Sequence, residues 1–357
     1  MIEQSLAGAW EFREVGTSKW LPARVPGTVH TDLLSAGRIP DPFVLDNELR
    51  VQWVAERDWE YRLVFRADPA LAAAERCTLV FDGLDTLAEV KLNDHRLGRA
   101  ENMFRQYRWD VAPILGPGEN ELRVTFFSPV VAARSRQAEQ PLLTVSHSIA
   151  GAPHLRKAPC QFGWDWGPRL PSSGIWKDVR LEGGNAARID DVRLRQRHRD
   201  GRVIVEAGVQ LERWQPGDLR IVLRVGEPDG QACERELLLT GGAAAGRLTV
   251  QIDDPRLWWP NGYGPQPLYD VQVALYQDDT LRDRRAFRIG LRRLELLQEP
   301  DAYGTSFGFA VNGVPVFAKG ANWIPADSFP TRVRDEHLEH LIRSAAAAHM
   351  NLSLIHI

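Results

Sequence analysis

The stretch WEYRLVF, residues Trp59–Phe65, alternates apolar and polar side chains over about one strand length. This alternation is typical of an antiparallel strand with one face buried and the other in water. The same pattern recurs further along the chain, in CTLVFDG (Cys77–Gly83), AEVKLND (Ala88–Asp94) and NELRVTFF (Asn120–Phe127). We therefore expect a first domain made of antiparallel sheets.

A second alternating series begins at about Ala187. Its members are RVIVEAGVQL (202–211), DLRIVLRVG (218–226), RELLLT (235–240), RLTVQID (247–253) and LYDVQVALY (268–276). Their spacing suits a β-sandwich of roughly 100 residues. GGAAAGR (Gly241–Arg247) lies inside the series and lacks the Lys-Ser/Thr ending and the following helix of a phosphate-binding loop. It predicts a hairpin turn.

The pattern changes after Arg292. VPVFAKGANW (Val314–Trp323) is a nearly continuous apolar run, which predicts a strand buried on both faces. RDEHLEHLIRSAAAAHM (Arg334–Met350) then has apolar residues at helical spacing. Strand, loop and helix form the opening unit of an α/β domain. Eight such units take ~250 residues, so we expect only the beginning of a barrel before Ile357.

The composition is that of ordinary globular material. Charged residues make up 25% of the chain and the net charge is −3, so neither nucleic acid nor a membrane surface is indicated as a partner. The sequence has no apolar run of the ~20 residues that span a bilayer and no signal-peptide start, which predicts a cytoplasmic protein. Cys77, Cys160 and Cys233 lack metal-ligand spacing, and His337 and His340 lack a third ligand. We therefore expect no metal and no cofactor.

FGWDWGP (Phe162–Pro168) places two tryptophans around one aspartate in a Gly- and Pro-flanked segment. An indole face packs against the C–H groups of a pyranose, and a carboxylate accepts strong hydrogen bonds from its hydroxyls. An alternative stays open, in which both tryptophans are core residues and Asp165 caps a turn. The preceding segment, Val130–Pro159, shows no sustained strand alternation. Loops of this length are usually functional or mobile, so we interpret this segment as a loop that extends from the sheets to a functional site.

Several stretches together resemble the β-mannosidases of glycoside hydrolase family 2, in that family's order. They are VPGTVHTDLLSAGRIPDPF (25–43), FDGLDTLAEVKLN (81–93), APCQFGWDWGPRLPSSGIWKDVRL (158–181), RLWWPNGYGPQPLYDV (256–271) and FAKGANWIPADSF (317–329). The resemblance implies a mainly β chain with three parts. A jelly-roll, galactose-binding-like sandwich would occupy 1–185, an immunoglobulin-like β-sandwich 186–292, and the first strand and helix of a truncated (β/α)8 catalytic barrel 293–357.

The resemblance also implies a substrate site. In this family the Trp-Asp of the FGWDWGP motif contacts the mannosyl unit to be cleaved, which assigns substrate-binding roles to Trp164 and Asp165. Trp166 matches the motif too, and we expect it to serve in packing. Asn322 and Trp323 would end the first barrel strand, where barrel enzymes build their sites. We expect them to line the site; anchoring of a loop at the barrel rim is the open alternative.

The implied activity is exo-acting release of terminal β-D-mannose with retention of configuration, from a β-mannoside oligosaccharide or glycoside. Retention requires two carboxyl groups ~5–5.5 Å apart, an acid and a nucleophile. In the family both glutamates belong to later barrel strands, so we expect no catalytic residue in this chain. The acid normally follows an asparagine, but Asn47-Glu48 and Asn120-Glu121 lie in the jelly-roll region, on or beside expected surface strands. We assign them no catalytic role.

The ending LSLIHI departs from the family pattern, in which a second barrel strand would follow Asn351. Read-through at the edge of an incomplete nucleotide record and a truncated gene product both stay open as explanations. Two functions also stay open. The favoured one is the N-terminal fragment of a β-mannosidase, inactive alone, with β-galactosidase, β-glucuronidase or exo-β-glucosaminidase as alternative specificities. The other is a non-catalytic carbohydrate-binding protein.

Overall fold

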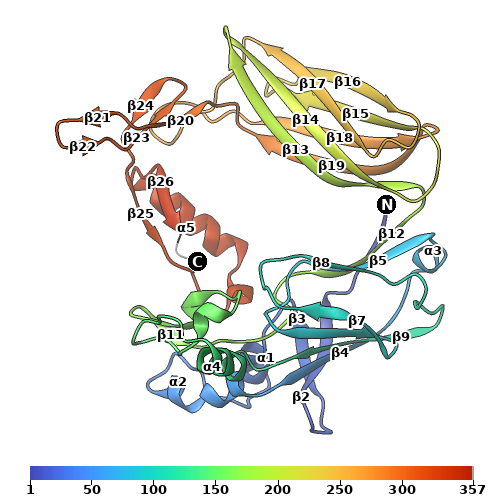
Figure 1. Ribbon diagram of the computed structural model, residues 1–357, viewed down its shortest axis with the longest axis vertical. Coiled ribbons are helices and arrows are strands. Elements are labelled where there is room, and N and C mark those ends of the chain that lie inside the picture. Colours follow the sequence, from blue (N-terminus) through green and yellow to red (C-terminus); the bar gives the residue numbers. More distant parts are fainter. Residues whose placement is uncertain (356–357) are drawn as a thin grey trace. The chain divides into compact units, whose positions relative to one another are not determined.

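The computed structural model describes residues 1–355, so the last two residues of the LSLIHI ending, His356 and Ile357, lie outside the described residues. The described chain divides into two compact units (Figure 1). The first unit contains residues 2–183 and 324–338, and the second contains Met1, 184–323 and 339–355. Each is described by itself.

The first unit is built on two antiparallel sheets. A six-stranded sheet has the order β3-β2-β4-β9-β6-β7 and a four-stranded sheet the order β1-β12-β5-β8. The strands expected around Trp59, Cys77, Ala88 and Asn120 are confirmed as β4, β5, β6 and β9. The bounds are β1 Ile2–Ser5, β2 Gly8–Glu14, β3 Leu21–Val25, β4 Trp59–Arg66, β5 Arg76–Phe81, β6 Ala88–Leu92, β7 His95–Ala100, β8 Tyr107–Asp110, β9 Glu119–Phe126 and β12 Val179–Gly184.

The alternation of apolar residues explains how this core forms. Trp59 and Tyr61 of β4 are buried, and every second residue of β9, including Leu122 and Val124, is buried beside them. Phe12 of β2 packs against both rings of β4 at 5.8 and 5.6 Å between centroids. Each such side chain contributes roughly 1.5–3 kcal/mol by leaving water, so the alternating pattern favours the orientation that turns these residues inward.

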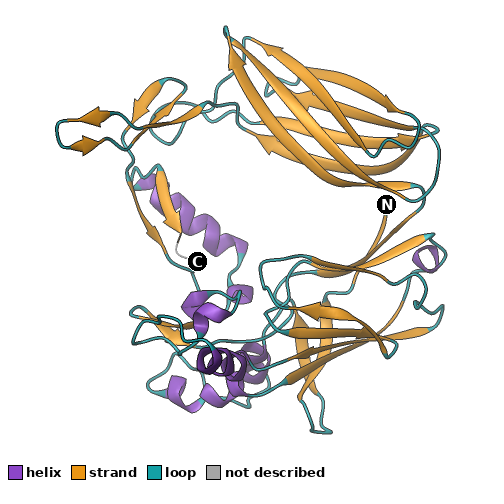
Figure 2. Ribbon diagram, in the orientation of Figure 1, coloured by secondary structure: helices purple, strands orange, loops and turns teal. Residues whose placement is uncertain are grey.

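The segment before FGWDWGP contains a helix that the sequence analysis missed. Helix α4 spans Pro129–Glu139, and the Ser128 hydroxyl accepts a hydrogen bond from the Val131 amide at its first turn. Serine followed by proline is a helix-start signal that was present in the sequence. Figure 2 shows α1, α2 and α4 grouped at one end of the first unit's strands. The helices of this unit are α1 Val29–Ser35, α2 Asn47–Arg50, η1 Gln52–Glu56, α3 Pro69–Ala72, α4, η2 Ala152–His154, η3 Pro159–Gln161 and η4 Pro330–Arg332.

A late segment of the chain completes the first unit. Phe329, from residues 324–338, is 1% exposed and belongs to the main core of this unit. Its ring stacks on His30 at 5.4 Å and meets Phe43 edge-on at 6.0 Å. The nearby Arg332 pairs with Asp327 at 2.7 Å. The core is therefore assembled from both ends of the described sequence.

The second unit contains the other sandwich, with sheets ordered β13-β14-β17 and β16-β15-β18-β19. The expectation of a mainly β chain with two successive sandwiches is thus confirmed. The hairpin predicted at GGAAAGR is wrong, because β16 pairs with β15 while β17 pairs with β14, so this loop crosses between the two sheets. The bounds are β13 Ala187–Arg199, β14 Arg202–Arg213, β15 Leu219–Gly226, β16 Ala232–Leu239, β17 Ala245–Asp253, β18 Tyr269–Gln277 and β19 Thr280–Ile289.

The single strand predicted for Val314–Trp323 is also wrong. Strand β24 (Val314–Val316) forms a hairpin with β23 (Gly308–Val311), and β25 (Gly320–Trp323) belongs to a different sheet. Asn312 and Gly313 make the turn of that hairpin with φ of +52° and +80°, the conformation that Asn-Gly favours. The run is not buried on both faces either, since Phe317 is 75% exposed.

The strand-and-helix order expected at the start of a barrel is present. Strand β25 is followed in the chain by α5 (Asp335–Ala347) and then by β26 (Leu352–Ile355), which pairs with β25 in parallel. Three further short strands come before β23 in the chain. They are β20 Leu294–Leu297, which pairs with β23, and the hairpin of β21 Pro300–Asp301 and β22 Gly304–Thr305. Within residues 1–355, none of the helices has the length and apolar character that a membrane crossing demands.

Candidate functional site

FGWDWGP folds as a short hairpin of the first unit. Strand β10 (Phe162–Trp164) pairs with β11 (Gly167–Arg169), and Trp164 stands opposite Gly167. Asp165 and Trp166 therefore form the tip. Trp164 is 43% and Trp166 40% exposed, and Asp165 is exposed as well. The alternative in which both tryptophans are core residues of the first sandwich is wrong, whereas the packing role expected for Trp166 stays a prediction.

The base of this hairpin is buried. Phe162 is fully buried with Leu87, Ala133 of α4 and Leu155 in a small apolar cluster. Its carbonyl oxygen accepts a hydrogen bond from the Ile149 amide at 2.9 Å. The helix and loop between residues 129 and 161 thus form the apolar support from which the exposed tip projects.

Polar side chains of α2 and η1 hold the second strand of the hairpin. The Arg169 amide donates to Oε1 of Glu48 at 2.8 Å, and the Arg169 carbonyl oxygen accepts from Nε2 of Gln52 at 2.8 Å. Glu48 was expected on or beside a surface strand and lies in α2 instead. Its carboxylate therefore supports the backbone of β11.

Close packing around Gly163 fixes the orientation of Trp164. Gly163 has φ of +105°, and a Cβ atom there would lie 2.6 Å from Cγ of Arg169 and 2.8 Å from the His147 carbonyl oxygen. Arg169 Nε donates to that same carbonyl oxygen at 2.9 Å. The His147 ring meets Trp164 edge-on, with centroids 5.4 Å apart and planes at 87°. Only glycine fits here, and the indole is held on one side.

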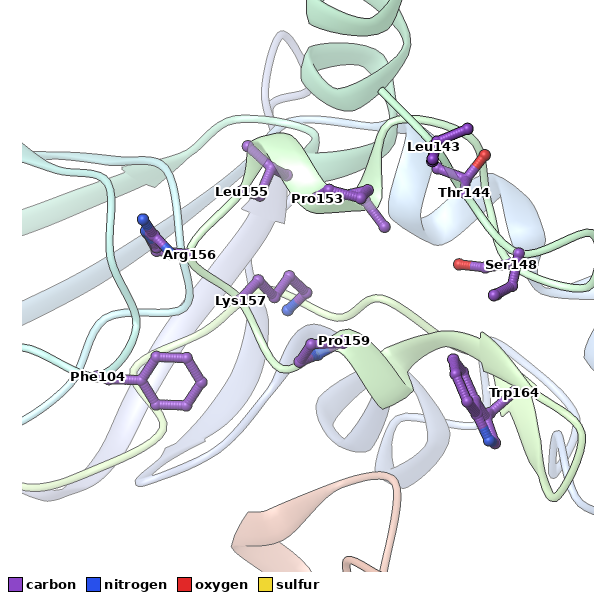
Figure 3. A pocket seen from close by; sticks show the side chains of 12 residues that line it. Phe104, Leu143, Thr144, Ser148, Pro153, Leu155, Arg156, Lys157, Pro159 and Trp164 are labelled. Atoms are coloured by element: carbon purple, nitrogen blue, oxygen red, sulfur yellow. The ribbon is translucent and has the colours of Figure 1, made fainter. Parts of the chain in front are cut away.

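A cavity of about 460 Å³ lies beside Trp164 (Figure 3). In this view Phe104 and Trp164 stand at its two ends, with Lys157 between them. Both rings are about half exposed, and Thr144 and Ser148 add hydroxyl-bearing residues to the lining. The lining residues are Phe104, Leu143, Thr144, Val145, Ser148, Ala152, Pro153, Leu155, Arg156, Lys157, Pro159 and Trp164. Aromatic faces with a few hydroxyls suit a ligand that is partly apolar and partly polar.

A buried ion pair lies at the base of the loop. Lys157 Nζ is 2.5 Å from Oδ2 of Asp85, and the two side chains are 0% and 1% exposed. Lys157 also donates to the Ser172 carbonyl oxygen at 2.5 Å, and the Ser172 hydroxyl is 2.9 Å from Nδ1 of His30. Burial lowers the pKa of Lys157, and the Asp85 carboxylate opposes that shift. Burial, with a smaller effect of Lys157, lowers the pKa of His30 to about 3, so its ring is neutral.

The other two predicted site residues belong to the second unit. Asn322 and Trp323 are the last residues of β25 and pair in parallel with Leu354 and Ile355 of β26. Asn322 is exposed and Trp323 is half-buried. The structure thus places Trp164 with Asp165 on one hairpin and Asn322 with Trp323 on one strand end, each pair within its own unit.

Sequence reasoning missed the buried ion pair of Asp85 and Lys157. Asp85 lies within FDGLDTLAEVKLN between Leu84 and Leu87, both of which are buried. Lys157 directly precedes APCQFGWDWGP. For Asp85 the available signal was a charge in an apolar stretch, because a charge in a buried segment needs a partner. Lys157 follows Arg156, so its surroundings in the sequence carry no such signal.

Comparison with known proteins identifies the domains. The family model described as glycosyl hydrolase 2 galactose-binding domain-like matches residues 10–177, and the model for glycosyl hydrolases family 2 matches residues 187–292. The expected order of a jelly-roll, galactose-binding-like domain followed by an immunoglobulin-like sandwich is confirmed.

Similar proteins are named β-mannosidases. Beta-mannosidase B of Emericella nidulans is 36% identical over 96% of this chain and 42% of its own length. The β-mannosidase of Rattus norvegicus is 34% identical over 97% of this chain and 41% of its own length. The crystal structure of the β-D-mannosidase from Dictyoglomus thermophilum matches with a TM-score of 0.95 and 39% identity, over 99% of this chain and 44% of that one.

A more distant structure shares the fold alone. The exo-chitosanase of Amycolatopsis orientalis matches with a TM-score of 0.75 at 18% identity, over 99% of this chain and 41% of that one. The chain spans about two fifths of the length of the curated relatives it matches. With both family domains present in order between residues 10 and 292, the chain belongs to glycosyl hydrolases family 2.

Proposed function

We propose that this chain forms the N-terminal part of an exo-acting β-mannosidase that releases terminal β-D-mannose with retention of configuration. Trp164 and Asp165 contact the mannosyl unit to be cleaved. The observation that carries the proposal is the exposed Trp-Asp pair on a hairpin whose backbone is held at both strands. The relatives at 34–39% identity are named β-mannosidases, which supports mannose as the sugar that is released.

The two side chains divide the recognition of the sugar. The exposed face of Trp164 packs against the C–H groups of the pyranose ring, while Asp165 accepts hydrogen bonds from hydroxyls at fixed angles. Neither residue breaks the bond. A retaining glycosidase uses two carboxyl groups ~5–5.5 Å apart. We place both in the part of the relatives that this chain does not span.

Asn322 and Trp323 are also substrate-binding residues in this proposal. They end β25, the first strand of a parallel βαβ unit, and active sites of (β/α)8 barrels form at such strand ends. The division into 1–185, 186–292 and 293–357 also remains our proposal. The ends of the two family models, at 177 and 292, support it.

The test uses an enzyme in which this chain is continued by the C-terminal region of the Dictyoglomus thermophilum relative. Asp165→Ala should lower kcat/KM for an aryl β-mannoside by about 10²–10³-fold, because charge-assisted hydrogen bonds to hydroxyls are lost. Asp301→Ala is the matched control, since Asp301 is also an exposed aspartate at a hairpin turn. An unchanged kcat/KM for Asp165→Ala would make Asp165 a turn residue. A panel of aryl β-galactoside, β-glucuronide and β-glucosaminide separates the alternative specificities.

A further inference from the structure

The loop that carries Trp164 and Asp165 is closed at its base by one buried cation. Lys157 begins the loop, and its ammonium group donates to the carbonyl oxygen of Ser172, 15 positions further along the chain, at 2.5 Å. The same ammonium group pairs with Oδ2 of Asp85 at 2.5 Å. Both ends of the loop therefore meet at Lys157 Nζ.

Asp85 ties this point to the body of the unit. Its amide donates to the Gly174 carbonyl oxygen and its carbonyl oxygen accepts from the Gly174 amide, both at 2.9 Å. The Val29 amide donates to the Ser173 carbonyl oxygen at 2.8 Å. The closing end of the loop is thus held by backbone hydrogen bonds from two other parts of the chain. The opening end is held by Met103, whose amide donates to the Arg156 carbonyl oxygen at 3.0 Å, and by the Lys157 side chain, which alone bonds the opening end directly to Ser172.

Stability alone is a weak reason for such a pair. Two charges taken out of water lose hydration, and an apolar pair of the same shape often serves stability equally well or better. An apolar pair cannot donate to the Ser172 carbonyl oxygen, however. The contact that only the charged pair supplies is the one that joins the two ends of the loop.

We propose that Lys157 and Asp85 are a positioning pair that fixes the Trp164–Asp165 hairpin by clamping both ends of the loop from 157 to 172. The pair touches no sugar. The inference deepens the proposed function and rests on it for the role of the hairpin in substrate binding, but the clamp itself is a property of the chain that can be measured without substrate.

The experiment measures amide hydrogen exchange by mass spectrometry on the 357-residue chain. In Lys157→Met/Asp85→Leu both side chains keep their approximate shape and lose their charge. We expect its unfolding midpoint to lie above those of both single variants, in each of which one charge stays buried without its partner, and below that of the wild type, because the buried Ser172 carbonyl oxygen loses its donor. Amides of residues 158–171 should nevertheless exchange about tenfold faster, since the loop opens without the clamp. Amides of β4 and β9 should keep their wild-type rates.

Controls separate a clamp from a general loss of structure. Arg13→Met/Glu60→Leu removes an ion pair of 2.6 Å in the same unit, on β2 and β4, and should leave residues 158–171 unchanged. Lys157→Met/Asp85→Asn is a second version that keeps an oxygen acceptor for the Thr86 hydroxyl. Wild-type exchange of the loop in a folded double variant would overturn the proposal. Equal acceleration throughout the first unit, or failure of both double variants to fold, would do the same by showing a purely structural role.

The result does not depend on the proposed function. If the loop loosens as expected while Asp165→Ala retains full activity, the sugar contact is wrong and the positioning pair stands. If the loop is unchanged while Asp165→Ala loses activity, the sugar contact stands without the clamp.

Discussion

Two short hairpins of this chain carry an aspartate and an aromatic residue at an exposed turn, and they differ in what holds them. At β10–β11 the tip is Asp165 and Trp166, and the strands are held by Glu48, Gln52 and the apolar cluster under Phe162. At β21–β22 the turn carries Asp301 and the fully exposed Tyr303.

The hydrogen bonds at the second hairpin are local. The Asp301 carboxylate accepts a hydrogen bond from the Tyr303 amide. Just outside the strands, the Glu299 amide donates to the Ser306 hydroxyl. The comparison teaches that an exposed carboxylate beside an aromatic ring is not by itself a binding site. What distinguishes the first hairpin is support from distant parts of the sequence, which fixes the side chains before a ligand arrives.

The substitution with the largest expected effect removes one of these distant contacts. Lys157→Met leaves the Asp85 carboxylate buried without its cation, and we expect the free energy of unfolding to fall by about 3–5 kcal/mol. Urea unfolding followed by circular dichroism measures it. The control is Arg293→Met, directly before β20. Arg293 pairs with Glu295, the two side chains are 56% and 32% exposed, and we expect no measurable change from the substitution. Equal effects of both substitutions would contradict the comparison.

The pH dependence of stability provides the second test, through two buried groups of α1. Burial raises the pKa of Asp32 to about 7, so its contribution to stability is full below its ordinary value of 3.8 and is lost as the pH rises through about 7. The pKa of His30 is lowered to about 3, so its contribution is full above 6.5 and is lost as the pH falls through about 3. The two slopes oppose each other between pH 3.8 and 6.5.

In Asp32→Asn, the pH dependence of the free energy of unfolding should therefore be that of His30 without the opposing contribution of Asp32. We expect its free energy of unfolding to rise by at most about 1.4 kcal/mol per pH unit between pH 4 and 6.5, while the wild type changes less. Urea titrations at pH 4, 5 and 6.5 measure the slope. A variant as flat as the wild type would show that these two groups do not control stability in this range.

A third substitution tests the close packing beneath Trp164. Gly163→Ala should cost roughly 1–3 kcal/mol, because a Cβ atom there meets Arg169 and the His147 carbonyl oxygen in a backbone conformation that favours glycine. Gly308→Ala is the matched control, since nothing lies within 4 Å of a Cβ atom at that position. Thermal unfolding of both variants measures the difference. Indistinguishable melting temperatures would show that the loop adapts freely.

The substitution with the smallest expected effect tests how β11 is supported, in comparison with the β21–β22 hairpin. Glu48→Ala removes the acceptor of the Arg169 amide, which we expect to cost about 1 kcal/mol locally. Hydrogen exchange should accelerate at Arg169 and leave the six-stranded sheet unchanged. Asp301→Ala should affect only the Tyr303 amide. Exchange at Arg169 that matches the wild type would assign the support of the hairpin to Gln52 and the apolar cluster.

Much of the fold was predictable, because alternation along a strand reports the two faces of a sheet directly. Strand β4 and its neighbours follow from that signal alone. The alternation does not say which strands pair, which is why the predictions of a hairpin at GGAAAGR and of one strand over Val314–Trp323 are wrong. Helix α4 was missed because its composition lacks a clear apolar stripe, although Ser128 and Pro129 mark its start.

The site was predictable only in its exposed part. The aromatic and acidic residues of FGWDWGP indicate sugar chemistry through their side chains alone. The partner of Lys157 is 72 positions away, and no local pattern connects it to Asp85. Pairing of that kind depends on the completed fold, so residues that position a site are harder to find than residues that contact a ligand.

The burial of Phe329 has a consequence for the order of folding during synthesis. This ring fills a place between His30 and Phe43 in the first core, yet it is translated after the whole second sandwich. Domains generally fold as units as the chain emerges from the ribosome. The first domain therefore cannot complete its core until the segment around Phe329 has been synthesised, and a nascent chain that ends before that point lacks the ring that packs on His30 and Phe43.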